Sequence, residues 1–308
     1  MKVLVGYSGF VGGNIYASTD FDAVFDHRDI EKAFGINPDF LIYAGIPAEK
    51  YLANNFPEKD YEIILNAENN IKKINPKKLV LISSVDVIDD TNNFDENGTI
   101  DESKLQPYGY NRRQLEKWAR ENYEDCLIVR LPALFGKGIK KNFIFDLINI
   151  VPTMIKVDKM EELSKINNSI LEYYTLQDNG FYKINSLDKN QKENLKKICF
   201  DVGFTALNFT DSRNKYQFYN LANLWKDIEK ALNNDIRLMH LATEPISAQE
   251  VFKYVKGEEF NNEFLNTPVS YNYKTINART YGSSDDYIYH KEEILKDIKR
   301  FINEEESK

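Results

Sequence analysis

The sequence contains few of the residues that form disulfide frameworks and metal sites. Two cysteines, Cys126 and Cys199, and three histidines, His27, His240 and His290, occur among 308 residues. Two cysteines cannot build a disulfide framework or a cysteine-based metal site, and the histidines show no metal-ligand spacing. We therefore expect neither structural disulfides nor a bound metal.

Long apolar runs are also missing. The most apolar stretch, residues 143–155, is interrupted by Asp146, Asn149 and Pro152. It falls short of the roughly 18 consecutive apolar residues that a membrane-spanning helix needs. The amino-terminal segment MKVLVGYSGF reaches a glycine after five residues, which is too short for the core of a signal peptide. These features predict a cytoplasmic protein without a membrane segment.

Positive charge is not in excess. The chain has 48 acidic and 40 basic residues, and a net charge of −8. A broad surface for nucleic acid or for an anionic membrane needs clustered positive charge, so neither partner is expected. With 42% hydrophobic residues, the chain is long enough to bury a large core as one domain or as two closely associated ones.

Short apolar runs rich in β-branched residues alternate with helical patterns in the first half of the chain. Strands are predicted at 2–9, 22–26, 39–46, 77–85 and 125–136. Apolar residues at helical spacing predict helices at 66–74 and 112–123. This alternation is typical of a parallel sheet covered by helices. The sequence therefore predicts an α/β fold with a Rossmann-type, doubly wound parallel sheet.

The second half of the chain is less regular. Residues 137–215 are polar, with one amphipathic helix near 191–202, and a strand–helix–strand pattern returns at about 216–242. We expect a dinucleotide-binding domain at 1–136, completed by about 216–242. Residues 137–215 and 243–308 are expected to form a smaller, mainly helical substrate-binding lobe.

Three glycines follow the first predicted strand directly. Gly6, Gly9 and Gly12 enclose Phe10 and Val11 in the segment GYSGFVGG. A glycine turn at this place lets backbone N–H groups and a helix N-terminus face a pyrophosphate without an intervening side chain. The spacing is three and three, where the commonest dinucleotide fingerprint has two and three. The position after the first strand of an α/β chain favours cofactor binding over an ordinary tight turn.

Charged residues at the end of the second predicted strand give two competing predictions about the cofactor. Asp26 is placed to accept hydrogen bonds from the ribose hydroxyls, which favours NAD. Arg28 is placed to hold the 2′-phosphate of NADP instead. Asp29 and Ile30 would then lie beside the adenine. The sequence leaves the choice between NAD and NADP open.

A serine, a tyrosine and an arginine form the second candidate constellation. Ser84 lies at the end of the most convincing strand, beside Ser83, and Tyr108 follows at the start of a helical pattern. Arg112 is one helical turn after Tyr108, so the two side chains share a face. Chance alone produces a few tyrosine–basic pairs at this spacing, so the serine strand upstream is what gives the pattern its weight.

Several ordered motifs together resemble the extended short-chain dehydrogenases/reductases, a family of nucleotide-sugar epimerases, dehydratases and reductases. The motifs span most of the chain: GYSGFVG, LIYAG, LVLISSVDV, PYGYNRRQLE, IVRLPALFGKG and LMHLATEPIS. Within the family, the short second strand and the segment GKGIKKNF look most like 4-keto-sugar reductases of the dTDP-rhamnose type. The resemblance implies an enzyme that binds NAD or NADP and acts on a small-molecule substrate.

The resemblance also implies roles for individual residues. Tyr108 would be the general acid/base on a sugar hydroxyl or keto group, and Ser84 would hydrogen-bond the same oxygen. Ala44 and Gly45 would line the cofactor. Further substrate contacts are expected from the residues next to these motifs, which are Ser83, Lys141 and Asn142. For Lys141 and Asn142, a solvated loop is an equally good interpretation.

Two residues depart from the family pattern. Arg112 stands where the family has a lysine, and Ala133 where an asparagine is often found. An arginine stabilises a phenolate through its charge but is a poor proton relay, because a guanidinium hardly deprotonates.

The best-supported function is an NAD(P)-dependent oxidoreductase or epimerase acting on a nucleotide-linked sugar, with Tyr108, Ser84 and Arg112 as catalytic residues. The departures keep open an alternative, a catalytically inactive dinucleotide-binding regulator or scaffold. The sugar, the reaction direction and the formation of a homodimer also stay open.

Overall fold

The computed structural model describes residues 1–307, which form two compact units. Unit 1 consists of Met1–Ile139, Lys215–Ile246 and Val269–Asp297. Unit 2 consists of Lys140–Asn214, Ser247–Pro268 and Ile298–Lys308. The chain thus leaves unit 1 and returns to it twice. The expected lobe contained all of 243–308, whereas Val269–Asp297 is part of unit 1, where the Ile288 N–H donates to the carbonyl oxygen of Ala242.

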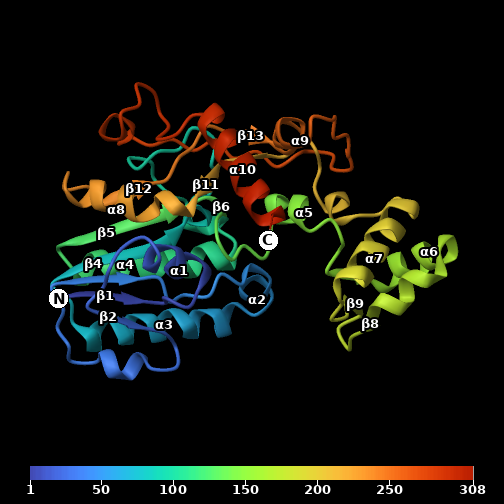
Figure 1. Cartoon of the computed structure of the whole chain (residues 1–308). Coiled ribbons are helices and arrows are strands. Elements are labelled where there is room, and N and C mark those ends of the chain that lie inside the picture. The colour runs from blue at the N-terminus through green and yellow to red at the C-terminus, as the bar shows by residue number, and fades with distance from the viewer. Residues whose placement is uncertain (308) are drawn as a thin grey trace. The chain divides into compact units, whose positions relative to one another are not determined.

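Six strands form the central sheet of unit 1 (Figure 1), in the spatial order β12-β5-β4-β3-β1-β2. In that order they are β12 (Leu238–His240), β5 (Cys126–Leu131), β4 (Lys78–Ser84), β3 (Phe40–Tyr43), β1 (Lys2–Val5) and β2 (Ala23–Phe25). Every neighbouring pair is parallel. The chain winds from β1 to β2 on one side and then crosses to β3 on the other. This confirms the doubly wound parallel sheet, whose switch point between β1 and β3 is where such folds bind ligands.

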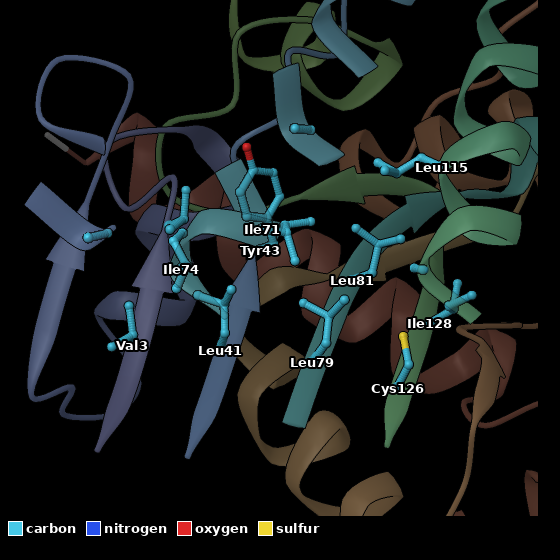
Figure 2. Packing of buried hydrophobic residues seen from close by; sticks show 14 of the residues in the cluster. Val3, Leu41, Tyr43, Ile71, Ile74, Leu79, Leu81, Leu115, Cys126 and Ile128 are labelled. Carbon is cyan, nitrogen blue, oxygen red and sulfur yellow. The ribbon is translucent and has the colours of Figure 1, made fainter. Parts of the chain in front are cut away.

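Helices of unit 1 cover both faces of this sheet. They are α1 (Phe10–Tyr16), α2 (Lys50–Asn55), α3 (Pro57–Ile74), α4 (Pro107–Asn122) and α8 (Leu224–Leu232). Side chains alternate between the two faces along each strand. Leu41 and Leu79 pack with Ile71 of α3 and Leu115 of α4 on one face (Figure 2). Ile42 and its neighbours pack with residues of α1 and α8 on the other.

Two predicted boundaries differ from the observed ones. Helix α3 begins at Pro57, before the predicted start at 66. The sequence showed no amphipathic pattern in its first turns, because they expose apolar side chains and bury a charged one, Asp60. The predicted strand 125–136 is two strands, β5 and β6 (Ala133–Phe135), because Pro132 between them has no N–H to donate. Strand β6 pairs with β11 (Phe218–Asn220), and β10 (Lys215–Tyr216) pairs with β13 (Ile246–Ser247).

Unit 2 has its own small core around Ile155, Leu163 and Leu195. Its helices are α5 (Phe143–Ile148), α6 (Val157–Ile166), α7 (Lys189–Asp201) and α9 (Ala248–Lys256), and α10 (Lys291–Glu306) ends in it. It also contains an antiparallel sheet that the sequence did not predict, with β7 (Met154–Lys156), β9 (Phe181–Ile184) and β8 (Tyr174–Leu176). These strands are too short for a clear period-two pattern.

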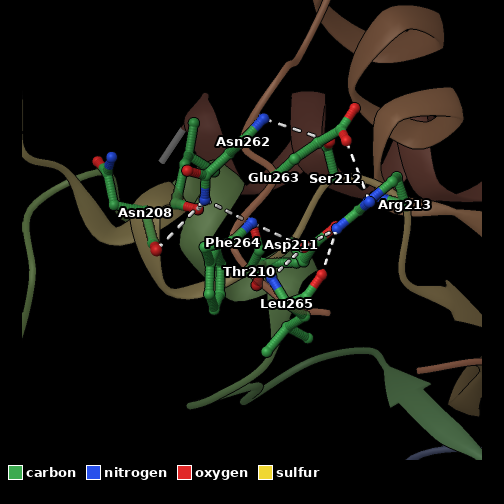
Figure 3. A network of polar contacts seen from close by, with 10 residues as sticks. Asn208, Thr210, Asp211, Ser212, Arg213, Asn262, Glu263, Phe264 and Leu265 are labelled. Carbon is green, nitrogen blue, oxygen red and sulfur yellow. Dashed lines mark hydrogen bonds and ion pairs between the residues drawn. The ribbon is translucent and has the colours of Figure 1, made fainter. Parts of the chain in front are cut away.

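A buried carboxylate organises the polar part of unit 2. Asp211 has no exposed surface and accepts hydrogen bonds from Arg213 and from the backbone N–H groups of Phe264 and Leu265 (Figure 3). The Arg213 guanidinium, followed by these backbone groups, holds the pKa of Asp211 well below its usual value. The carboxylate therefore joins the chain near residue 211 to the chain near residue 264.

Within residues 1–307, none of the helices combines the length and the apolar character that crossing a membrane requires.

Candidate active site

The turn between β1 and α1 is shaped by its glycines. Gly6 has a φ of +95°, and a Cβ on it would lie 2.5 Å from the carbonyl oxygen of Ala44. A Cβ on Gly12 would lie 2.1 Å from the carbonyl oxygen of Gly6. These two positions therefore exclude every side chain for reasons of packing alone.

Gly9 differs from its two neighbours in the motif. Its φ of −82° and ψ of 171° suit any residue, and a Cβ there would approach only the Gly6 carbonyl oxygen, at 3.3 Å. It is the N-cap of α1, without a side-chain capping bond. Phe10 and Val11 begin the helix and pack against the sheet core. Gly9 thus leaves the backbone open at a helix start, which suits the close approach of an anionic group.

Ala44 and Gly45 lie beside this turn. Ala44 follows β3 and donates its N–H to the carbonyl oxygen of Val5 at 2.9 Å, and Gly45 is exposed. The structure therefore brings Ala44 and Gly45 against Gly6, at the carboxyl ends of β1 and β3. Their role in lining a cofactor stays a prediction.

Asp26 and Arg28 form an ion pair after β2. The Arg28 guanidinium donates Nε to Asp26 Oδ1 at 3.0 Å and Nη2 to Asp26 Oδ2 at 2.5 Å. Arg28 therefore holds the pKa of Asp26 well below its usual value. Asp26 is buried, whereas Arg28 is 65% exposed. The residues predicted to contact the ribose hydroxyls and the 2′-phosphate thus belong to one ion pair, and Arg28 is its accessible member.

The residues next to this pair shape its loop. Asp29 accepts the Asp26 N–H at 2.9 Å, and Ile30 begins a short 3₁₀ turn, with its side chain packed against the sheet core.

Tyr108 lies in the first turn of α4, buried, with Arg112 over its ring. The guanidinium carbon of Arg112 is 3.7 Å from the ring centroid. Burial raises the pKa of Tyr108 above its usual value, and Asp86 adds to this, against the opposing charges of Arg112 and Lys50. The free protein therefore holds Tyr108 as a neutral phenol.

The Arg112 guanidinium faces a carboxylate. It donates Nη1 to Asp60 Oδ2 at 2.5 Å and Nη2 to Asp60 Oδ1 at 3.0 Å. It also donates to the carbonyl oxygens of Tyr108 and Pro47. Arg112 and Asp60 are both almost fully buried. The structure thus brings Arg112 to Tyr108 as predicted, but it gives the arginine a tethering role between α3 and α4 that the sequence did not predict.

Ser84 and Ser83, at the end of β4, have different partners. The Ser84 hydroxyl donates to Asp86 Oδ2 at 2.9 Å and accepts the Asp86 N–H at 3.2 Å. Asp86 in turn accepts a hydrogen bond from Lys50 Nζ at 2.7 Å. Ser83 is buried and donates to Glu116 Oε1 at 2.6 Å. Ser84 is thus linked to Tyr108 through Asp86 and Lys50, whereas the Ser83 hydroxyl donates to a carboxylate inside the fold. We call Tyr108 and the polar side chains joined around it the Tyr108 cluster, which consists of Tyr108, Arg112, Asp60, Lys50, Asp86 and Ser84.

Lys141 and Asn142 belong to unit 2. Asn142 has a φ of 101°, and its side chain caps α5 by accepting the N–H groups of Ile144 and Phe145. Lys141 is exposed beside it. The capping role accounts for an asparagine at position 142, and no contact with a substrate is needed to explain it.

Sequence reasoning missed three polar residues of the cluster, namely Lys50, Asp60 and Asp86. Lys50 and Asp86 lie just after strands β3 and β4, where parallel sheets collect functional side chains, and that position was the available signal. Asp60 gave no signal, because its burial depends on the packing of α3 against α4.

Comparison with known proteins shows similarity in structure alone. No family model matches the chain, and no curated protein does. A dTDP-4-dehydrorhamnose reductase from Bacillus anthracis, solved in complex with NADP, superposes with a TM-score of 0.62 at 15% identity, covering 98% of this chain and 97% of that one. A UDP-N-acetylglucosamine 4-epimerase from Methanobrevibacter ruminantium, in complex with UDP-N-acetylmuramic acid, gives a TM-score of 0.58 at 14% identity, covering 98% and 96%.

A second dTDP-4-dehydrorhamnose reductase, from Yersinia enterocolitica, gives a TM-score of 0.62 at 14% identity, covering 98% of each chain. These similarities extend over both units and over nearly the whole length of the proteins compared. The chain therefore has the same fold as these nucleotide-sugar reductases and this epimerase.

Proposed function

We propose that the chain is an NAD(P)-dependent oxidoreductase or epimerase that acts on a nucleotide-linked sugar. The observation that carries the proposal is the joint position of two features at the carboxyl edge of one parallel sheet. The glycine turn, open at Gly9, follows β1, and Ser84 of the Tyr108 cluster ends β4. Solved proteins with this fold were crystallised with NADP or with a nucleotide sugar.

The residues around the glycine turn fit a dinucleotide. Gly9 leaves the space that a pyrophosphate needs, and the first N–H groups of α1 have no helical partner. Arg28 and Asp26 lie after the next strand, at the place of the adenosine ribose. A bound nicotinamide dinucleotide would supply the hydride-transferring ring.

Tyr108 is the proton-transferring residue in this proposal. At neutral pH the phenol carries its proton and can give it to a sugar oxygen during reduction; burial raises its pKa, and the charges of Arg112 and Lys50 oppose that rise. Ser84 donates its hydrogen to Asp86 in the free protein. It therefore holds Asp86 in place, and it contacts a substrate oxygen only after its hydroxyl turns away from that carboxylate.

A panel of nucleotide sugars, each incubated with NAD or NADP in either redox state, tests the proposal. Products are followed by mass spectrometry, because an epimerase that retains its cofactor shows no net change in nicotinamide absorbance. Conversion of at least one sugar supports the proposal. Cofactor binding by calorimetry without any conversion favours the second candidate, an inactive dinucleotide-binding regulator. The observation in favour of that candidate is the pairing of Arg112 with Asp60, which removes the arginine from proton transfer.

A further inference from the structure

Two cations lie over the Tyr108 ring in the described part of the chain. Arg112 lies 3.7 Å from the ring centroid, and the ammonium of Lys50 lies 5.7 Å from it. The two come from different elements, since Arg112 belongs to α4 and Lys50 begins α2. A tyrosine that gives up a proton needs a nearby group to restore it, so the question is which cation does this.

Arg112 is unsuited to that task. Both nitrogens at the end of its guanidinium already donate two hydrogen bonds each, to Asp60, Tyr108 O and Pro47 O. Its side chain is only 4% exposed, so water reaches it poorly. A guanidinium also hardly ever loses its proton in a protein. Arg112 therefore acts on Tyr108 as a fixed charge and as a support for the ring.

Lys50 has the opposite properties. Its side chain is 55% exposed, and its ammonium is held by the Asp86 carboxylate at 2.7 Å. An ammonium has three hydrogens, so the bond to Asp86 leaves donors for water, and Tyr108 lies within reach of its charge, with the ring centroid at 5.7 Å. Partial burial lowers the pKa of Lys50, but the charge and hydrogen bond of Asp86, followed by Tyr271 and Tyr108, raise it overall. The resting lysine is thus a charged, solvent-connected proton donor.

On the basis of the proposed function, we propose that Lys50, held by Asp86, is the proton relay for Tyr108 in place of a lysine at position 112. Asp86 links the parts of this relay, because it accepts from both Lys50 and Ser84. The charged and titratable groups that face the pair are Asp86, Arg112 and Tyr271. Lys50 and Asp86 are therefore positioning residues for Tyr108, and neither needs to touch the sugar.

The proton balance is as follows. The O–H bond of Tyr108 breaks as its proton forms a bond to the substrate oxygen, which leaves a phenolate. An N–H bond of Lys50 breaks next, and its proton reaches the phenolate oxygen through solvent water, which restores the phenol. The neutral amine takes a proton from water at its exposed side. In the oxidation direction every transfer is reversed, and no further reactant is required.

The charge part of this proposal is tested on the protein without cofactor or substrate. Difluorotyrosine is incorporated at position 108, where it lowers the phenol pKa and gives one fluorine signal whose shift reports the titration. Lys50→Met is expected to raise the pKa of this phenol, and Lys50→Arg to leave it nearly unchanged. Lys59→Met is the matched control, because Lys59 lies over a different ring, that of Phe56, at 5.3 Å. An identical titration in wild type and Lys50→Met overturns the proposal.

The relay part is tested by turnover of whichever nucleotide sugar the wild type converts. Lys50→Ala and Lys50→Arg are both expected to lose roughly a hundredfold in turnover, with cofactor affinity retained. Added methylamine should restore much of the activity of Lys50→Ala, whereas added guanidinium should not, because only the amine exchanges protons. Wild-type turnover in Lys50→Arg, or equal rescue by both cations, overturns the relay. If the wild type converts no sugar, the proposed function fails, while the fluorine titration still decides whether Lys50 acts on Tyr108.

Discussion

The three glycines after β1 have different roles at the residue scale. A side chain at Gly6 or Gly12 would overlap backbone atoms, whereas a Cβ at Gly9 would make one close contact, 3.3 Å from the Gly6 carbonyl oxygen. The motif spacing predicts the turn, but it does not separate these roles, because they depend on how closely the end of β3 approaches. Only Gly9 therefore allows cofactor binding to be tested with the fold kept.

Gly9→Val is expected to abolish measurable NAD(P) binding, since the valine would occupy the space proposed for the pyrophosphate. Its thermal unfolding should stay close to that of the wild type. The comparison variant is Gly12→Ala, in which overlap with the Gly6 carbonyl should cost about 1–3 kcal/mol of stability. Calorimetric titration and thermal unfolding measure both effects. Unchanged cofactor affinity in Gly9→Val would show that the turn does not bind a dinucleotide.

The Asp26–Arg28 pair predicts a change of cofactor preference. Arg28→Ala removes the exposed guanidinium and leaves the Asp26 carboxylate without its counter-charge. Both changes disfavour a 2′-phosphate, so the affinity for NADP should fall more than that for NAD, by roughly tenfold or more. Asp26→Asn should shift the preference in the opposite direction. Dissociation constants for both cofactors provide the measurement, and an unaltered ratio in both variants would place the pair outside the site.

At the element scale, α3 and α4 are joined by a charge pair inside their interface. Asp60 on α3 accepts hydrogen bonds from Asn111 and Arg112 on α4. The helices themselves follow from apolar spacing, but the partner of Arg112 does not. The two residues are far apart in sequence, and a buried pair is recognised only after the helices are packed. For this reason the sequence indicated only the position of Arg112 beside Tyr108, and the tether to Asp60 became visible in the structure.

Arg112→Ala is expected to lower the free energy of unfolding by about 3–5 kcal/mol, because it leaves Asp60 buried without a partner. The double variant Asp60→Ala/Arg112→Ala should recover part of this loss. Arg112→Lys should also destabilise the protein, since lysine cannot make the two-armed contact to Asp60. Denaturant unfolding of the four proteins measures the coupling. An unchanged free energy of unfolding in Arg112→Ala would show that the pair with Asp60 does not stabilise the helix interface.

At the scale of the whole molecule, the two units have separate cores and different degrees of predictability. The sheet strands of unit 1 are buried on both faces, so they occur as continuous apolar runs and can be predicted from the sequence. Unit 2 combines a small apolar core with short strands and with polar contacts such as those of Asp211. Such contacts join distant residues and leave no periodic signal. The predicted fold was therefore confirmed for the sheet, whereas the three-stranded sheet of unit 2 was not predicted.

Asp211→Asn is expected to destabilise unit 2 and to lower its melting temperature by several degrees. The pKa of Asp211 is lowered on folding, so its contribution is present above the unfolded pKa of about 3.9 and is lost as the pH falls toward the folded value. The difference between wild type and variant should therefore shrink in acid. Hydrogen exchange, resolved by peptide, should show faster exchange near residues 211 and 264 than in the unit 1 strands. Equal protection in both proteins at neutral pH would contradict this account.

In the proposed function, this site transfers a hydride to or from a sugar while Tyr108 transfers a proton. The most direct measurement uses reduced nicotinamide cofactor that carries deuterium at the transferable position, with a 4-keto nucleotide sugar as substrate. Deuterium is expected to appear in the sugar product of the wild type. In Tyr108→Phe it should appear at least about a hundredfold more slowly, with cofactor affinity unchanged. Product that forms without deuterium, or at the same rate in Tyr108→Phe, would contradict the proposed function.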